Sequence, residues 1–269
     1  MSRWFPAAVL VVTCVAGGAG LWYYRHAQAR PLLGLTAPSN DWLAGLESAN
    51  PQTNAEATKD VRELGARALP VIQKTLNDPT AVPHRKKTVI RACALIGLQC
   101  LPAMSDVVAY LAQPEFAAEA AMALSLMGAD AYAPLADALE SDHPQVRCEA
   151  ARALGKLYER APLEASAVVP PLLELLADAD PDVRQVAATY LGIIHEYPDA
   201  AIPALSEMLQ DEDAEVRLAA ARALGEFGPA AEPAMPALRR AQGDKDENVA
   251  REAGLAVVKL QAQKLPGGR

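Results

Sequence analysis

Residues 214–242, AEVRLAAARALGEFGPAAEPAMPALRRAQ, decide the fold. The first part of this stretch has apolar residues at the 3.6-residue period of one helical face, namely Val216, Ala219, Ala220, Ala223 and Leu224. Gly225 and Gly228 predict the end of that helix, and Pro236 predicts the start of a second one, because the first helical position needs no N–H donor. Neither helix is long enough to be stable alone. We therefore expect two helices folded back on each other and stacked on further copies.

Two landmarks recur along the chain with one period. The residues that predict the ends of first helices are Gly65, Gly97, Gly128, Gly155, Gly192 and Gly225, spaced by 27 to 37 residues. The residues that predict the starts of second helices are Pro70, Pro102, Pro134, Pro171, Pro203 and Pro236, spaced by 32 to 37 residues. Because two independent landmarks keep one period, the sequence predicts an array of stacked repeats.

A shared motif strengthens this prediction. The segments PDVRQVAATYLG, AEVRLAAARALG and PQVRCEAARALG each join a Val-Arg pair to a small-residue helix. The pattern resembles the HEAT repeat of the short PBS-lyase type over residues 53–262, most closely over 142–240. The segment RELGARALPVIQKTLND, behind an apolar N-terminus and a WLAGL helix, is similar to membrane-tethered bacterial HEAT-repeat proteins. The resemblance implies an α-solenoid and names no activity.

Composition and pattern together predict an all-α protein. Apolar residues make up 51% of the chain and aromatic residues 5%, and no alternating β-branched run predicts a strand. We expect an α-solenoid of about six antiparallel helix pairs plus capping helices, preceded by a single N-terminal apolar helix. The expected domains are an anchor or signal segment over 1–30, a linker over 31–40 and the solenoid over 41–264. Residues 41–48 and 246–262 predict the two capping helices.

The N-terminal segment predicts membrane attachment. Residues 4–24 carry no charge and reach about 31 Å as a helix, close to the thickness of a bilayer core. Aromatic residues lie at both ends, as in membrane anchors. The alternative is a cleaved signal peptide, with Ala27-Gln28-Ala29 as the cleavage site. We expect a single-pass anchor with the array outside the cytoplasm, although Arg25 and Arg30 favour the opposite orientation.

One arginine per repeat predicts a structural ladder of ion pairs. Arg147, Arg184 and Arg217 each follow a valine, and the acids shortly before them are Asp142, Asp180 and Asp213. We expect these side chains to form hydrogen-bonded pairs that tie neighbouring repeats together. A basic binding stripe is the alternative. The densest basic run, residues 84–87, predicts either a contact with an acidic partner or a solvated helix face.

One polar side chain per second helix predicts a binding surface. HEAT-like stacks place their second helices on the concave side, so these polar residues are the binding candidates: Lys74, Asp106, Asp137, Glu174, Glu207 and Arg240. The acidic centre of this series would prefer a basic segment of a protein partner. Ordinary solvation of an exposed helix face explains the same pattern. The loop over 156–170, the longest between landmarks, is interpreted as a tolerated insertion.

The sequence predicts no catalytic centre, metal site or cofactor. The four histidines, His26, His84, His143 and His195, lie in separate segments without the spacing of a ligand face. Deoxyhypusine hydroxylase, a HEAT-repeat iron enzyme, uses several His-Glu pairs, whereas this chain has only His195-Glu196. The cysteines Cys14, Cys93, Cys100 and Cys148 include no C-x-x-C pair, and we expect those of the array to be buried apolar side chains. Gly97 lies between Cys93 and Cys100, so the spacing does not place them on one helical face.

The net charge of −8 disfavours binding to nucleic acid. The predicted function is a non-catalytic, membrane-tethered scaffold that binds a protein along the concave face. The alternative is an enzyme or enzyme accessory of the bilin-lyase or metal-dependent hydroxylase type. Sequence leaves the partner and the oligomeric state open.

Overall fold

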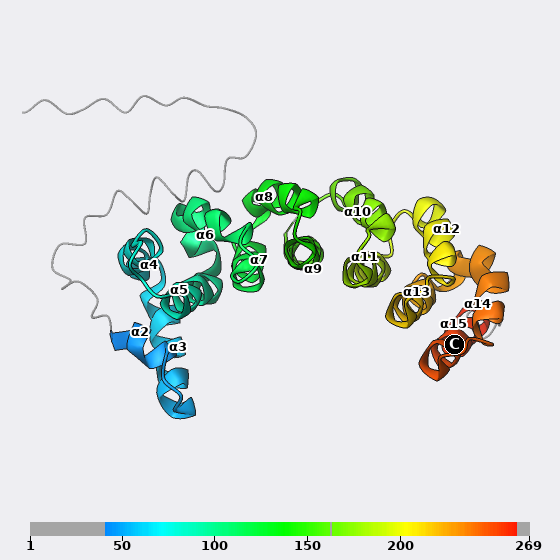
Figure 1. The fold of residues 1–269 in the computed structure, drawn as a ribbon, viewed down its shortest axis with the longest axis horizontal. Coiled ribbons are helices and arrows are strands. Elements are labelled where there is room, and N and C mark those ends of the chain that lie inside the picture. The colour runs from blue at the N-terminus through cyan, green and yellow to red at the C-terminus, as the bar shows by residue number, and fades with distance from the viewer. Residues whose placement is uncertain (1–40, 162, 263–269) are drawn as a thin grey trace, which may run out of the picture. The chain divides into compact units, whose positions relative to one another are not determined.

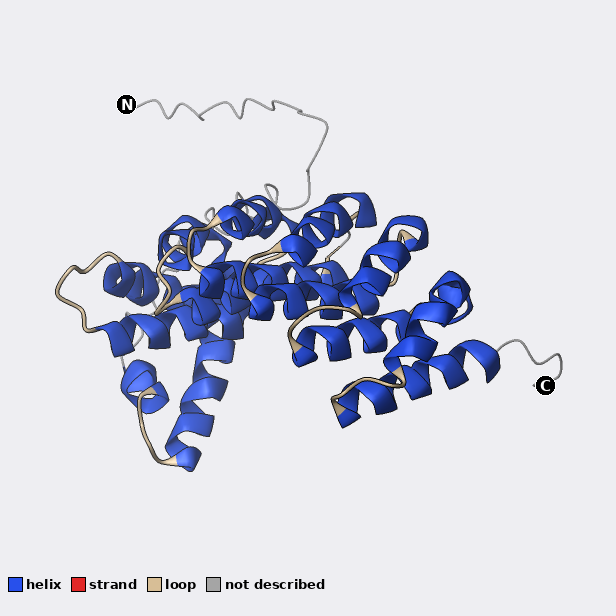
Figure 2. Cartoon of the chain, turned by 45° about the vertical axis from the view of Figure 1, so that its right-hand side comes forward, coloured by secondary structure: helices blue, strands red, loops and turns tan. Residues whose placement is uncertain are grey.

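The computed structural model describes residues 41–161 and 163–262, and short helices follow one another along this part of the chain (Figure 1). These residues belong to one unit, Ser39–Arg269. The described part of the chain consists of helices and loops and has no strand, so the all-α prediction is confirmed (Figure 2). The predicted apolar helix over 4–24, the linker over 31–40 and the last two residues of the predicted solenoid, 263–264, lie outside the described residues.

The helices after α2 (Asp41–Leu46), the first helix among the described residues, alternate between two rows. The even row comprises α4 (Leu69–Leu76), α6 (Met104–Leu111), α8 (Tyr132–Asp137), α10 (Ala165–Glu174), α12 (Pro198–Met208) and α14 (Met235–Ala241). The odd row comprises α3 (Pro51–Leu64), α5 (Pro83–Ile96), α7 (Ala117–Ser125), α9 (Pro144–Arg160), α11 (Pro181–Ile194), α13 (Ala214–Glu226) and α15 (Glu247–Ala262). The predicted capping helices correspond to α2 and α15.

Short 3-10 helices lead from an odd helix to the next even helix or extend an even helix. The connecting ones are η1 (Gly65–Ala68), η2 (Gly97–Ala103), η3 (Ala129–Ala131) and η6 (Gly228–Ala234). The extending ones are η4 (Ala138–Glu140) and η5 (Leu175–Ala177). The predicted insertion over 156–170 is mostly helical, because its ends belong to α9 and α10.

Each tight hairpin consists of an even helix and the odd helix that follows it. α12 packs against α13 and α14 packs against α15, whereas α13 and α14 touch little. The hairpin predicted for residues 214–242, which would pair α13 with α14, is therefore wrong. Each of these helices packs instead against the one on its other side, α13 against α12 and α14 against α15. The 3-10 segment η6 separates α13 from α14, while only a short turn joins α12 to α13. The short connection allows the close antiparallel packing.

The odd row is the more closely spaced of the two rows. Consecutive odd helices from α5 to α15 pack directly against one another, whereas neighbouring even helices make few contacts. Small residues permit this close approach, since Gly192 faces Ala223 and Gly225 faces Ala256. A stack bends toward its more closely spaced row. The odd row therefore lies on the concave side of the array (Figure 1).

The hydrophobic core is a continuous seam between the two rows. Its largest fully buried side chains come from both rows and from almost every repeat: Ile72, Ile90, Leu124, Met127, Leu135, Leu154, Leu157, Leu172, Leu191, Leu205, Leu224 and Leu238. Because each short helix buries only one face, its stability comes from this shared seam and from its neighbours.

The recurrent glycines have two different roles. Gly65 and Gly97 have φ values of 53° and 55° and follow the ends of α3 and α5, as predicted. Gly155 and Gly192 instead lie inside α9 and α11, so the helix ends predicted there are wrong. The helix α13 ends at Glu226, between Gly225 and Gly228, as predicted. At Gly155, an added Cβ would overlap the ring of Tyr190. Such a glycine is required for close helix packing and not for a turn.

Gly192→Ala is expected to destabilise the array by about 1–3 kcal/mol. The new methyl carbon would lie 2.6 Å from the Cα atom of Ala223, so α11 and α13 would have to separate. Gly225→Ala is the matched control, because its methyl carbon would lie 3.4 Å from the nearest atom, the Cβ of Ala256. This control gains helix propensity and should be neutral or stabilising. Urea unfolding followed by circular dichroism compares them, and equal losses would contradict the packing argument.

Length and hydropathy single out Pro83–Leu111 as a candidate membrane span. This segment is not one straight helix, because it comprises α5, η2 and α6, with a backbone reversal at Gly97. Its apolar residues Val89, Ile90 and Val107 are fully buried in the core. We therefore assign its apolar character to the seam of the array.

Candidate interaction surface

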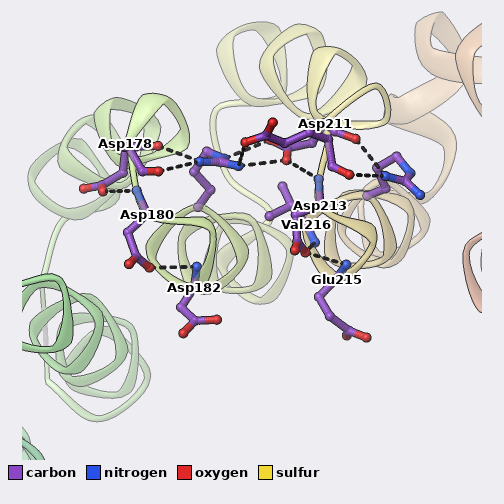
Figure 3. Close-up of polar contacts among 11 residues, drawn as sticks. Asp178, Asp180, Asp182, Asp211, Asp213, Glu215 and Val216 are labelled. Atoms are coloured by element: carbon purple, nitrogen blue, oxygen red, sulfur yellow. Dashed lines mark hydrogen bonds and ion pairs between the residues drawn. The ribbon is translucent and has the colours of Figure 1, made fainter.

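Three arginines of the odd row bind three aspartates in the turns that precede the next odd helix. Figure 3 shows two of these turns, with Asp178 and Asp211 labelled. Arg147 contacts Asp178 through its Nε and Nη2 atoms, at 2.7 Å each. The other two pairs have the same two-point geometry: Arg184 with Asp211 at 2.8 and 2.9 Å, and Arg217 with Asp244 at 2.7 and 3.0 Å. We call these three pairs the arginine ladder. Charge-assisted, two-point pairs of this kind are strong and directional.

The arginine ladder is continuous from repeat to repeat. Arg184 donates through Nη1 to the backbone carbonyl of Asp178, whose carboxylate binds Arg147. Arg217 donates in the same way to the carbonyl of Asp211. Each of these two aspartates therefore joins the arginine of its own repeat to the arginine of the repeat before it. The side chains are largely buried, with 10% of Arg184 and 7% of Asp211 exposed.

The predicted acidic partners were wrong, although the arginines do tie neighbouring repeats together. Asp180 and Asp213 cap α11 and α13 by accepting backbone N–H groups of their first turns. Asp142 is exposed, and its side chain makes no contact with the arginine beside it. The signal for the true partners was the Asp-x-Asp pattern in DADPDVR, DEDAEVR and DKDENVA. The first aspartate of each pattern binds the arginine of the preceding repeat, and the second caps a helix.

The arginine ladder does not extend into the N-terminal repeats, because other residues occupy the positions of its arginines and aspartates there. In α7, Ala120 occupies the position of the arginine, and Ser141 occupies the position of the next aspartate. In α5 the corresponding residue is Lys86, whose Nζ lies 5.3 Å from the centre of the Tyr110 ring. The ladder therefore spans the C-terminal part of the array, and cation–π contacts replace it near the N-terminus.

The basic run at residues 84–87 contacts other parts of the array. Arg85 binds Glu47 through Nε and Nη2 at 3.2 and 3.3 Å. Lys87 lies 5.7 Å from the centre of the Phe116 ring and 4.0 Å from Glu119. The cations of this run join α5 to the turn after α2, to α6 and to α7, while His84 and Arg85 remain exposed.

The six residues predicted to line the concave face all lie in the even row. Lys74, Asp137, Glu174, Glu207 and Arg240 are exposed. Asp106 is half-buried and accepts a hydrogen bond from the side chain of Asn77 at 3.3 Å. The predicted position was wrong, because the more closely spaced odd row lies on the concave side. One polar residue per helix does follow the even row, but on the convex side.

The odd row exposes apolar side chains among charged ones. Met122 on α7, Ile193 on α11, and Leu255 and Val258 on α15 are between 41% and 60% exposed. A cavity of about 280 Å³ lies between α11 and α13 on this row. We call it the α11–α13 cavity. Sequence reasoning missed this surface because it assigned the odd helices to the convex side.

The α11–α13 cavity has an apolar base and a polar rim. Gly192, Ala219 and Ala223 supply the small, buried part of its lining. On the rim, Glu226 binds Lys259 at 2.8 Å, and Arg222 binds Glu252 at 3.4 Å. Glu215 also lines the cavity, and its carboxylate has no ion-pair partner among the described residues. The rim therefore presents one unpaired negative charge beside an apolar hollow.

The described residues contain no group of three or more His, Cys, Asp and Glu side chains placed to hold a metal ion. His195 is exposed, has a left-handed backbone with φ of 39°, and ends α11. Its Nδ1 lies 2.9 Å from the carbonyl oxygen of Ile193. His195 thus contributes to a helix end in this structure.

A known protein family and a solved structure share this helical-repeat architecture. A family model described as HEAT repeats matches residues 104–168 and 169–259, more than half of the chain. A search of curated proteins found no match. Among solved structures, an engineered protein is 25% identical with a TM-score of 0.52, covering 82% of this chain and 67% of its own.

Two further solved structures have lower TM-scores. The complex of CpcE and CpcF of phycocyanin lyase from Nostoc sp. is 24% identical with a TM-score of 0.49, covering 58% of this chain and 98% of that one. A designed armadillo repeat protein in complex with the peptide (KR)4 is 22% identical with a TM-score of 0.43, covering 81% and 98%. On the match of the family model and the stacked hairpins, the chain belongs to the HEAT-repeat family.

Proposed function

We propose that this protein is a non-catalytic, membrane-tethered scaffold that binds a protein segment along the odd row. The observation that carries the proposal is the α11–α13 cavity, flanked by the exposed Ile193. Its volume of about 280 Å³ is at the lower limit of the roughly 300–1,000 Å³ of small-molecule sites. A cavity of this size suits one apolar side chain of a partner.

The charges of the rim define the partner further. Lys259 and Glu252 already pair with Glu226 and Arg222, so the carboxylate of Glu215 is the charge left for a ligand. A cationic residue next to the apolar anchor would complement it. The proposed partner is therefore a protein segment with an apolar side chain beside a lysine or arginine.

Membrane tethering is the second part of the proposal. The uncharged residues 4–24 have the length of a bilayer span, with aromatic residues at both ends. We propose that they anchor the chain and that the array lies outside the cytoplasm. The partner would then be a protein of the same membrane or compartment.

A site-specific cross-linking experiment tests the binding surface. A photo-reactive amino acid at the exposed Thr189 of α11 should capture one protein, identified by mass spectrometry, in the native membrane. The matched control places the same amino acid at Glu207, which is exposed on the even row. The same protein captured equally from both positions would contradict an odd-row site.

Ile193→Lys is expected to reduce that cross-link from Thr189 by about 30-fold, as expected for loss of an apolar hot spot. The new charge would also repel the cationic residue of the partner. Ile193→Val keeps the apolar contact and should cross-link nearly as well, and Asp137→Lys on the even row should have no effect. A covalently bound chromophore or stoichiometric iron in the purified protein would instead support the enzyme alternative.

A further inference from the structure

A series of exposed side chains follows the odd row. Within each odd helix from α5 to α15, one exposed residue lies between two residues that are buried or half-buried. These exposed residues are Arg91, Met122, Arg152, Thr189, Arg222 and Leu255. We call this series the odd-row ridge. Thr189 and Arg222 both line the α11–α13 cavity, so the ridge passes along the proposed binding surface.

On α7 the ridge residue is apolar and lies beside a cation. Met122 is 43% exposed, and the Nζ atom of Lys156 on α9 lies 3.8 Å from its sulfur. Because α7 packs directly against α9, the two side chains form one small surface across this joint. A flexible thioether adapts to the shape of an apolar ligand, and a lysine ammonium is a compact positive charge. We call this pair the Met122–Lys156 surface.

The positive charge of Lys156 is not neutralised within the described part of the chain. The sulfur of Met122 is its contact there, and no carboxylate of residues 41–161 or 163–262 lies within ion-pair distance. Arg152 on the same helix is instead paired with Glu149 at 3.5 Å. Arg91, the exposed ridge residue of α5, also has no carboxylate partner among these residues. This part of the ridge therefore has unpaired positive charge beside an apolar side chain.

We propose that the protein segment bound at the α11–α13 cavity continues along the ridge and places an acidic residue, next to an apolar one, on the Met122–Lys156 surface. This inference rests on the proposed function, because it extends the same binding surface. Charge complementarity places the carboxylate of the segment at Lys156 and its cation at Glu215. A segment with cations at both positions would be repelled by Lys156. The partner is therefore a segment with one acidic and one basic anchor.

The stacking of the odd helices sets the spacing between the two anchors. The helices α7, α9, α11 and α13 pack against one another in this order, so the surface between α7 and α9 is two helix spacings from the α11–α13 cavity (Figure 1). Two spacings of packed helices amount to about 16–20 Å. An extended chain advances about 3.3 Å per residue. The acidic and basic anchors should thus be about five or six residues apart.

The test measures binding of synthetic peptides to the purified full-length chain by fluorescence anisotropy. The first peptide joins a glutamate–leucine pair to a leucine–lysine pair through about five glycine and serine residues. The second peptide has glutamine in place of the glutamate. We expect the first peptide to bind about 10-fold more tightly, and this difference to shrink at high salt.

Substitution of Lys156 should remove that difference. Lys156→Glu is expected to weaken binding of the first peptide by about 10-fold and to leave the second unchanged, and Lys156→Gln should have a smaller effect in the same direction. Lys74→Glu is the matched control, because Lys74 is exposed on the even row, and it should have no effect. Circular dichroism checks that each variant is folded.

The cavity has a separate readout. Ile193→Lys should weaken binding of both peptides equally. Equal binding of the two peptides, or no change with Lys156→Glu while the Ile193→Lys effect persists, would overturn this inference alone. A Lys156 effect without an Ile193 effect would overturn the cavity as the site, and no binding of either peptide would overturn both. Lys156-dependent binding to phosphatidylserine vesicles without a peptide preference would assign the cation to a membrane surface and also overturn the inference.

Discussion

Arg184→Met is expected to lower the free energy of unfolding by about 3–5 kcal/mol, the cost of removing one partner of a buried ion pair. The substitution leaves the carboxylate of Asp211 buried without its two hydrogen bonds from Arg184. It also removes the donor to the backbone carbonyl of Asp178. Because Asp178 also binds Arg147, the loss should weaken two joints of the array. Equilibrium unfolding in urea measures the effect.

Two further variants test whether the loss of stability in Arg184→Met comes from the unpaired charge of Asp211 or from a general loss of packing. Arg152→Met removes an exposed pair, since the Arg152 side chain is 44% exposed and 3.5 Å from Glu149, and should change stability by at most about 0.5 kcal/mol. The double variant with Arg184→Met and Asp211→Asn removes the buried charge and keeps an acceptor for the N–H of Asp213. It should recover part of the loss. A double variant no more stable than Arg184→Met alone would contradict this account.

Acidification is expected to remove the stabilisation that the arginine ladder provides. Burial alone would raise the pKa of Asp178 and Asp211, but hydrogen bonds from Arg147, Arg184 and the backbone outweigh it, so both pKa values lie below the ordinary 3.8. The hydrogen bond from Arg217 likewise lowers the pKa of Asp244. Because the folded state holds these protons less tightly than the unfolded state, the contribution is fully present above pH 3.8 and is lost as the pH falls through the depressed values.

The urea midpoint should therefore decrease steeply below about pH 4. The double variant with Arg184→Met and Asp211→Asn lacks one of the three titrating pairs, so its midpoint should depend less steeply on pH over the same range. Circular dichroism at a series of pH values measures both profiles. Identical slopes in the two proteins would show that other carboxylates, and not the ladder, govern the acid response.

The ladder also distinguishes the two ends of the array. From α9 to α15, each joint has a buried or largely buried arginine bound to an aspartate of the next repeat. Near the N-terminus the joints depend on other contacts, such as the hydrogen bond from the Tyr110 hydroxyl to the carbonyl of Leu76 at 2.6 Å. Repeat arrays draw their stability from such nearest-neighbour interfaces.

The proposed binding surface depends on the same packing that sets the curvature. Gly192, Ala219 and Ala223 allow α11 and α13 to approach closely, and their lack of long side chains leaves the α11–α13 cavity above them. A substitution that fills this interface would therefore change both stability and partner binding. Stability and partner binding are coupled here because the same small residues form the helix contact and the base of the cavity.

The amino-acid sequence alone was sufficient for the fold class, the repeat period, the arginine of each ladder pair and the positions of the capping helices. These features depend on local periodicity, on proline and glycine chemistry, and on a motif repeated in neighbouring copies. Val216 and Leu224 lie on the predicted apolar face and are both buried, because the apolar face of one helix is visible in its own sequence.

Only the tertiary structure decided which helices form hairpins, which row is concave and which aspartate each arginine binds. Those features depend on the spacing between helices. In the sequence, Gly192 is equally consistent with a helix end and with a close helix–helix contact, and only the position of Ala223 in the structure distinguishes them. Asp178 and Asp180 are likewise not distinguished by the sequence. In the structure, Asp178 binds Arg147 of the preceding repeat, whereas Asp180 caps α11. Sequence specifies each face locally, whereas the distance between stacked faces arises from the packing of all their side chains.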